Sequence, residues 1–140
     1  MAKMRIKDGM FLGKDPADTA VKWAEDHLQM YIVTQSYRDG YVFAAGLEGV
    51  SKSLPAAGKA KAMGMAAGET DLRYYFAGGY TVMIELKTSD GKLTSSQKKR
   101  IPLLREMGFN VNIVYGDCPA SAWLGVKRIL ECGLVNEGDV

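Results

Sequence analysis

The sequence predicts a single α/β domain in which a mixed four-stranded sheet is flanked by helices, in the order α-β-β-β-α-β-α. Residues 80–87 alternate in polarity over eight positions, as strands do. Residues 94–107 begin with a capping-box sequence and end at Gly108, as helices do. The 140 residues are 47% hydrophobic and 24% charged, which supplies one core rather than two.

The other elements follow from local signals along the chain. Residues 1–14 read as an irregular tail of the one domain that covers residues 1–140. Asp15-Pro16 is a helix start with proline in the first turn. A last hydrophobic spacing, at Trp123, Val126 and Leu130, marks a final helix. These elements are expected at residues 15–37 (helix), 41–45 (strand), 56–63 (short helix), 70–76 (strand), 110–115 (strand) and 119–131 (helix).

The turn at residues 77–79 sets the register of the hairpin between the second and third strands. A three-residue loop places Asp71 opposite Glu85. A two-residue loop would place Asp71 opposite Leu86, on the other face, so convergence of the acids requires an odd loop or a bulge. Side-chain alternation also puts Lys87 on the face of Glu85.

Two facing carboxylates repel each other, and binding of Mg²⁺ or Mn²⁺ relieves that repulsion. The Lys87 ammonium can orient a water molecule and offset negative charge that develops on a phosphate. A lone Glu-x-Lys pair is more often the solvated face of an ordinary hairpin. The aligned Asp71 favours the metal site instead.

These residues resemble the PD-(D/E)xK nuclease superfamily and, within it, the VRR-NUC group, over roughly residues 25–129. The most specific part is residues 61–72, Lys-Ala-Met-Gly-Met-Ala-Ala-Gly-Glu-Thr-Asp-Leu, which is similar to the group's approach K-x-x-G-x-x-x-G-x-P-D-L to the first acid. Residues 84–88 and 91–94 then follow the group's pattern. Thr70 stands where the group usually has proline, which donates no ligand.

The resemblance implies a restriction-endonuclease-like core and a metal-dependent deoxyribonuclease. Its cofactor would be Mg²⁺ or Mn²⁺, bound by side chains and by one backbone carbonyl. An acid on the first helix often completes such a site. By this resemblance the catalytic residues are Asp71, Glu85, Lys87 and Gln97, and the metal ligands are Asp71, Glu85, the Leu86 carbonyl and Glu25.

Gln97 has two explanations. In the run Thr94-Ser95-Ser96-Gln97 it closes a capping box by folding back to the backbone at the start of the helix. It also lies one turn before Ile101, whose inward spacing directs Gln97 toward the sheet and the acids. The two roles can alternate.

The formal net charge of +2 is too small to identify a nucleic-acid binder by itself, so contacts with DNA must come from local clusters. Each cluster could equally be a solvated charged face. Proximity to the acids favours DNA contacts at Lys52, Lys59, Lys61, Lys98, Lys99 and Arg100.

The function that follows is hydrolysis of DNA phosphodiester bonds by an endonuclease, with branched or junction DNA as a candidate substrate. A homodimer is expected, because the chain has more apolar side chains than a small sheet readily buries. The same side chains could also cover one face of the sheet within a single subunit: Trp23, Tyr31, Tyr37, Met63 and Met65. Nothing in the sequence supports a helicase or another repair or replication partner.

A non-catalytic DNA-binding or assembly module with the same fold is the main alternative. An α/β ligand-binding domain lacks support, since no G-x-G-x-x-G run follows a strand.

The remaining signals concern compartment and zinc. Cys118 and Cys132 lack metal-ligand spacing and His27 is the only histidine, which argues against a structural zinc site. The N-terminus lacks a signal-peptide run, and no stretch reaches membrane-spanning length. We therefore expect a protein of the cytoplasm, in a bacterium or a phage-infected host cell, with no membrane partner.

Overall fold

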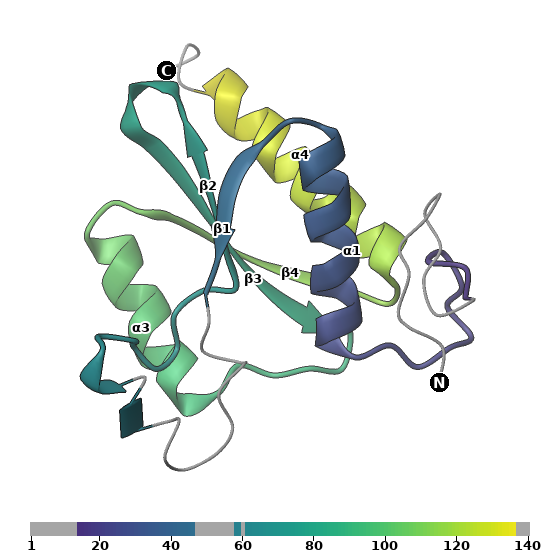
Figure 1. Cartoon of the computed structure of the whole chain (residues 1–140), viewed down its shortest axis with the longest axis horizontal. Coiled ribbons are helices and arrows are strands. Elements are labelled where there is room, and N and C mark those ends of the chain that lie inside the picture. Colours follow the sequence, from purple (N-terminus) through teal and green to yellow (C-terminus); the bar gives the residue numbers. More distant parts are fainter. Residues whose placement is uncertain (1–13, 47–57, 60, 137–140) are drawn as a thin grey trace. The chain divides into compact units, whose positions relative to one another are not determined.

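The computed structural model describes residues 14–46, 58–59 and 61–136, and the predicted tail at residues 1–14 lies outside these ranges except for Lys14 (Figure 1). The elements have the predicted order. Residues 58, 59, 61 and 62 are also helical, within the expected short helix. The helices and strands are α1 (Glu25–Arg38), β1 (Val42–Ala45), β2 (Leu72–Phe76), the 3-10 turn η1 (Ala77–Gly79), β3 (Tyr80–Thr88), α3 (Ser95–Glu106), β4 (Asn110–Gly116) and α4 (Pro119–Asn136).

The four strands form one sheet in the order β1-β2-β3-β4. β2 and β3 are antiparallel, whereas β3 and β4 are neighbours joined through α3, the crossover connection typical of parallel strands. The predicted α/β fold with a mixed four-stranded sheet flanked by helices is therefore confirmed.

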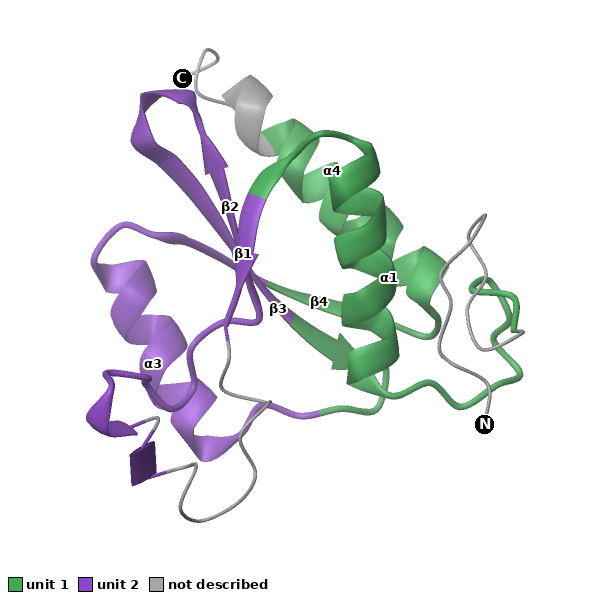
Figure 2. Cartoon of the chain, in the orientation of Figure 1, with its two compact units in different colours: residues 1–42, 86–91, 113–140 green, residues 43–85, 92–112 purple. Residues whose placement is uncertain are grey.

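Contacts divide the chain into two compact units, coloured in Figure 2. Unit 1 comprises residues 1–42, 86–91 and 113–140, and unit 2 comprises residues 43–85 and 92–112. Both β3 and β4 continue from one unit into the other. The assignment of residues 1–140 to one domain stays a prediction.

In unit 2 the hairpin has the three-residue loop that the convergence of acids requires. Gly78 and Gly79 have φ of 82° and 78°, a region that glycine enters without steric cost. Phe76 then pairs with Tyr80, and the register continues to Leu72 opposite Ile84. The predicted register is therefore confirmed over β2. The side chains that anchor the hairpin in its core are Leu72, Tyr74, Val82 and Ile84.

Helix α3 of unit 2 begins and ends where the sequence predicts. The Thr94 hydroxyl caps it by accepting a hydrogen bond from the backbone N–H of Gln97, and Gly108 follows the helix with φ of 97°. Ile101 and Leu104 form its buried stripe. Arg105 donates twice to the Val111 carbonyl and so fixes the helix end to the start of β4.

Unit 1 is built on the packing of α1 against α4, which lie side by side in Figure 1. Leu28 and Ile32 supply the buried face of α1. The side chains that bury the matching part of α4 are Ala122, Trp123, Val126 and Leu130. Helix α4 continues past the predicted end at residue 131 to Asn136. Gly133 does not end it, because a glycine inside a helix costs only about 1 kcal/mol. Within the described ranges, no helix combines the length and apolarity needed to cross a membrane.

The predicted helix start at Asp15-Pro16 is wrong, since α1 begins at Glu25. The Asp15 carboxylate accepts from the Ala17 amide, and the Asp18 carboxylate accepts from the Ala20 amide. Such local side-chain bonds offer the backbone an alternative to helical hydrogen bonding. The Trp23 indole then donates to the Asp18 carbonyl at 2.7 Å, which holds this segment as turns.

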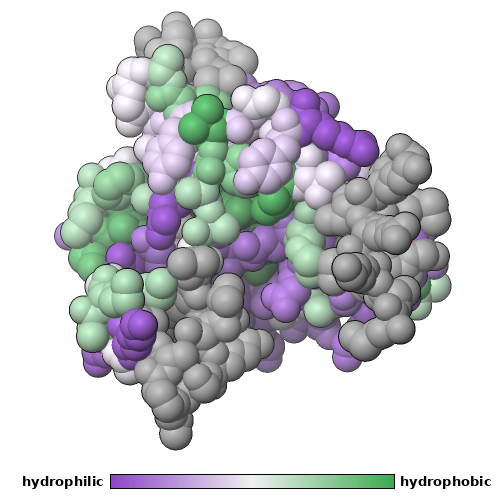
Figure 3. Space-filling view, in the orientation of Figure 1, coloured by the Kyte–Doolittle hydropathy of each residue, from purple (hydrophilic) through white to green (hydrophobic). Residues whose placement is uncertain are grey.

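The apolar side chains that suggested a dimer differ in exposure. Trp23 is buried within the chain and meets the His27 ring edge to face, so the expectation that it needs a second subunit is wrong. Tyr37 and Met63 are each 71% exposed. The face seen in Figure 3 likewise shows green hydrophobic surface beside purple hydrophilic side chains.

Candidate active site

Strand β3 carries an acid and a lysine into the protein interior. Glu85 is 1% exposed and Lys87 is 4% exposed, and the alternation of a strand places both on one face of β3. Burying a charged side chain is costly unless it is paired or hydrogen-bonded. The partners of Glu85 in unit 2 and of Lys87 in unit 1 are therefore described separately, each within its own unit.

In unit 2, Glu85 is held by Gln97 from the first turn of α3. The Gln97 side-chain Nε2 donates to Glu85 Oε2 at 2.6 Å. Asp71 precedes the first residue of β2, and continuing the observed register by one residue sets it opposite Glu85. The backbone carbonyl of Asp71 accepts from Gly46 at 3.0 Å, which ties the acid to the residue after β1.

Gln97 makes both of its predicted contacts, with the start of the helix and with an acid of the sheet, at the same time. Its Oε1 accepts from the Thr94 backbone N–H at 2.8 Å, while its Nε2 faces Glu85. The Thr94 backbone N–H can only donate, so the oxygen of the Gln97 amide must face it and the amide nitrogen faces Glu85. The expectation that the roles alternate is therefore wrong, because the two ends of one amide serve them separately.

In unit 1, Lys87 is paired with the carboxylate of Glu25. Lys87 Nζ lies 3.3 Å from Glu25 Oε1, and the Glu25 side chain is 45% exposed. Glu25 is the first residue of α1, whose backbone N–H groups favour an acid in the first turn. The predicted role of Glu25 as a metal ligand stays a prediction, and its observed contact is with the lysine.

The donor set fits a hard divalent cation. Glu85 is a buried carboxylate on the face that Asp71 shares by register, and Mg²⁺ and Mn²⁺ prefer such oxygen ligands. The Leu86 carbonyl, on the intervening residue of the strand, stays a predicted third ligand. Within the part of the chain that the structure describes, no three His, Cys, Asp or Glu side chains form a metal-binding group.

The approach to Asp71 is fixed by a close backbone contact at Gly68. This glycine has φ of +83°, and a Cβ built on it would lie 2.5 Å from the Ser96 carbonyl oxygen and 2.9 Å from the Gln97 amide nitrogen. Only glycine allows both the conformation and the approach. The segment that leads to Asp71 therefore rests directly on the first turn of α3.

Glu69 is a residue whose role the sequence did not reveal. Its carboxylate binds Arg73 Nη2 at 2.6 Å and Arg100 Nε at 3.2 Å. Burial by itself raises the pKa of Glu69, but the hydrogen bonds and charges of Arg100 and Arg73 outweigh burial and hold that pKa below its usual 4.5. Glu69 and Arg73 are four residues apart, but the chain is not helical there, so their spacing carried no signal for the pair.

The predicted DNA-contacting residues divide into three groups. Lys52 lies outside the described residues. Arg100 is partly exposed and bound to Glu69. The exposed lysines, Lys59, Lys61, Lys98 and Lys99, are accessible to a ligand, and their contacts with DNA stay predictions.

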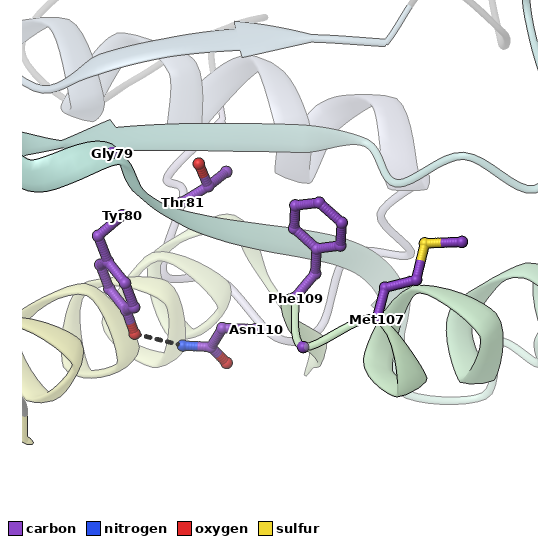
Figure 4. Close-up of a pocket in the computed structure, with 7 residues that line it drawn as sticks. Gly79, Tyr80, Thr81, Met107, Phe109 and Asn110 are labelled. Carbon is purple, nitrogen blue, oxygen red and sulfur yellow. Dashed lines mark hydrogen bonds between the residues drawn. The ribbon is translucent and has the colours of Figure 1, made fainter.

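A pocket of about 200 Å³ lies at the other end of β3 (Figure 4). Tyr80 and Asn110 line it, and the Asn110 amide donates to the Tyr80 hydroxyl at 2.9 Å. Along an extended strand, Tyr80 and Glu85 are about 16 Å apart. The pocket is therefore separate from the carboxylates of unit 2.

Comparisons with known proteins identify the fold. No protein-family model matches the sequence, and no curated protein does. A solved structure described as a VRR_NUC domain protein superposes with a TM-score of 0.60 and 22% sequence identity, over 79% of this chain and 91% of the other. The resemblance of residues 61–72 and 84–88 to that group had implied the same fold. The chain has the fold of a VRR-NUC domain protein.

Proposed function

We propose that this protein is a Mg²⁺- or Mn²⁺-dependent deoxyribonuclease that hydrolyses phosphodiester bonds as an endonuclease. The observation that carries the proposal is the buried Glu85, held by Gln97 on the strand face that also bears Lys87. Burial of these charges is unfavourable for a purely structural strand. It is favourable for chemistry on a phosphate, where charges in a dry site act strongly.

Each side chain has a distinct part in the proposed reaction. Asp71 and Glu85, with the Leu86 carbonyl, would hold the cation, which supplies Lewis-acid activation and charge stabilisation when bound. Gln97 keeps the Glu85 carboxylate in a fixed orientation through its 2.6 Å hydrogen bond. Lys87 presents a localised positive charge where negative charge develops on the phosphate in the transition state.

A panel of labelled DNAs tests the proposal. Duplex, flap, splayed and four-way-junction substrates are incubated with the protein in Mg²⁺, in Mn²⁺ or in chelator, and internal cuts are mapped on gels. We expect cleavage that depends on the metal and is lost in Glu85→Gln. Binding of DNA without cleavage in either metal would instead identify a non-catalytic DNA-binding module.

We further propose that the working unit is a homodimer acting on branched DNA. The exposed Tyr37 and Met63 support an additional interface, and a two-fold pair would present two sites to two strands. Light scattering should give twice the mass of one chain, and Tyr37→Ser should shift the equilibrium toward the monomer. A monomer mass at micromolar concentration, unchanged when junction DNA adds only its own mass, would exclude the dimer.

A further inference from the structure

Two arginines of unit 2 share a single carboxylate beside the candidate active site. Arg73 lies on β2 and Arg100 lies on α3, and both bind Glu69. Their side chains are 24% and 31% exposed, so solvent and ligands reach them. With two positive charges and one negative charge, the cluster retains a net positive charge.

Most of the donors of this cluster are available. Within the described part of the chain, Arg73 uses one terminal nitrogen and Arg100 uses its Nε to bind Glu69. A guanidinium has five N–H donors in a rigid planar fork. Glu69 therefore orients both forks while leaving other N–H groups to meet an anion, and paired arginine forks match the oxygens of a phosphate.

The position of the cluster relates it to the acids of unit 2. Arg73 lies two residues after Asp71 and therefore on the same face of β2, diagonal to Glu85 across the hairpin. Arg100 lies one turn after Gln97, which reaches Glu85 from the same side of α3. Both guanidiniums thus lie on the face that carries the carboxylates.

We propose that Arg73 and Arg100, oriented by Glu69, form a subsite for a phosphodiester of the DNA backbone next to the one that is cleaved. The proposal rests on the proposed nuclease function and adds a contact that fixes the position of the strand. The alternative is a purely structural clamp, in which Glu69 only fastens the approach segment to α3. The two differ in what loss of Glu69 does.

Affinity for DNA in the absence of metal tests the subsite apart from cleavage. Binding of a short labelled duplex is measured by fluorescence anisotropy in chelator, over a range of salt concentrations. We expect Arg73→Gln and Arg100→Gln each to weaken binding about tenfold and to reduce the salt slope by about one. Glu69→Gln removes the competing negative charge while its side-chain oxygen can still accept from the arginines and orient them, so it should keep or increase affinity.

Matched variants separate charge and folding from the specific contact. Arg128→Gln, at an exposed position of α4, makes the same change in net charge and should alter affinity little. Arg73→Lys and Arg100→Lys should keep the salt slope but lose part of the affinity, since an ammonium lacks the fork. Circular dichroism and the melting temperature establish that each variant is folded.

The outcomes distinguish the subsite from the nuclease. Weaker binding by Glu69→Gln together with both arginine variants would show a structural clamp and overturn the subsite. Cleavage by the wild type, with arginine variants that bind as it does, would also overturn the subsite while the nuclease stands. DNA binding without cleavage in Mg²⁺ or Mn²⁺ would overturn the nuclease alone, and absence of DNA binding would overturn both.

Discussion

The two ends of strand β3 differ in the burial and charge of their side chains. Toward its end, β3 carries two buried charged side chains: Glu85 accepts a hydrogen bond from Gln97 within unit 2, and Lys87 forms an ion pair with Glu25 within unit 1. At its start, by the hairpin loop, Tyr80 and Thr81 line a pocket together with the exposed Met107 and Phe109.

The difference shows that the pocket and the buried charged side chains lie at different ends of this strand. Buried charges cost stability and are retained only where something compensates them. The pocket has a hydrogen bond between two neutral side chains and a lining of polar and apolar residues without a charge, and such a lining costs little stability and activates no substrate. We therefore assign the chemistry to the buried charged end, although the cavity lies at the other.

The largest expected effect comes from removing an acid at the charged end. Glu85→Gln or Asp71→Asn should lower cleavage at least about a thousandfold, since loss of a cation ligand removes several kcal/mol of transition-state stabilisation. DNA affinity should hold or rise, because repulsion of phosphate decreases. Asn110→Ala at the pocket end is the matched control, and gel assays should show its cleavage rate unchanged.

If the Asn110→Ala variant lost cleavage while the Glu85→Gln variant kept it, the chemistry would belong to the pocket end of β3 and not to the charged end. The melting temperature of the Glu85→Gln variant provides a second test, of the cost of burying this charge. Removing a buried charge while keeping the shape of the side chain should leave the protein as stable as the wild type, or more so.

A smaller effect is expected at the lysine. Lys87→Ala should reduce single-turnover cleavage about a hundredfold with little change in DNA affinity, because its charge acts where transition-state charge develops. Lys98→Ala combined with Lys99→Ala should instead weaken binding and flatten its salt dependence. A Lys87→Ala protein that lost affinity but retained its single-turnover rate would contradict the catalytic role.

Loss of Glu25, the partner of Lys87, should reduce cleavage less than loss of the lysine. Glu25→Gln is expected to reduce cleavage about tenfold and to leave metal affinity unchanged in calorimetry, because the observed contact of this half-exposed carboxylate is with Lys87. A fall in metal affinity would instead support the predicted role of Glu25 as a ligand.

The smallest effect concerns Glu69, an acid that is paired but not fully buried. Its pKa is lowered in the folded state, so its contribution to stability is present above the pKa of the unfolded chain, near 4.5, and is lost as the pH falls through the lower folded value. Glu69→Gln should lower the melting temperature by a few degrees near neutral pH. That difference should vanish in strong acid, and a constant difference would contradict the ionic contribution.

Local signals made the hairpin and α3 predictable from the sequence. The glycines at 78 and 79 marked the loop but allowed two or three residues in it, and the requirement that Asp71 face Glu85 favoured the three-residue loop that the structure has. Thr94 and Gly108 likewise marked the ends of α3. Each of these features depends on residues close together in the chain.

Predictions failed where local bonds compete with the helix or where partners are distant in sequence. The turns at Asp15 and Asp18 delay α1, although Pro16 suits a helix start. Lys87 pairs with Glu25, and Arg100 with Glu69, across separations that no periodicity encodes. The single amide of Gln97 satisfying two partners also required three-dimensional positions.

The shared amide of Gln97 makes helix fraying an event at the candidate site. When the first turn of α3 opens, the cap to Thr94 and the bond to Glu85 depend on the same side chain. Terminal turns open more readily than the core of a protein. Hydrogen exchange at the Gln97 backbone amide, which Thr94 protects, therefore reports how often the buried carboxylate loses its fixed orientation.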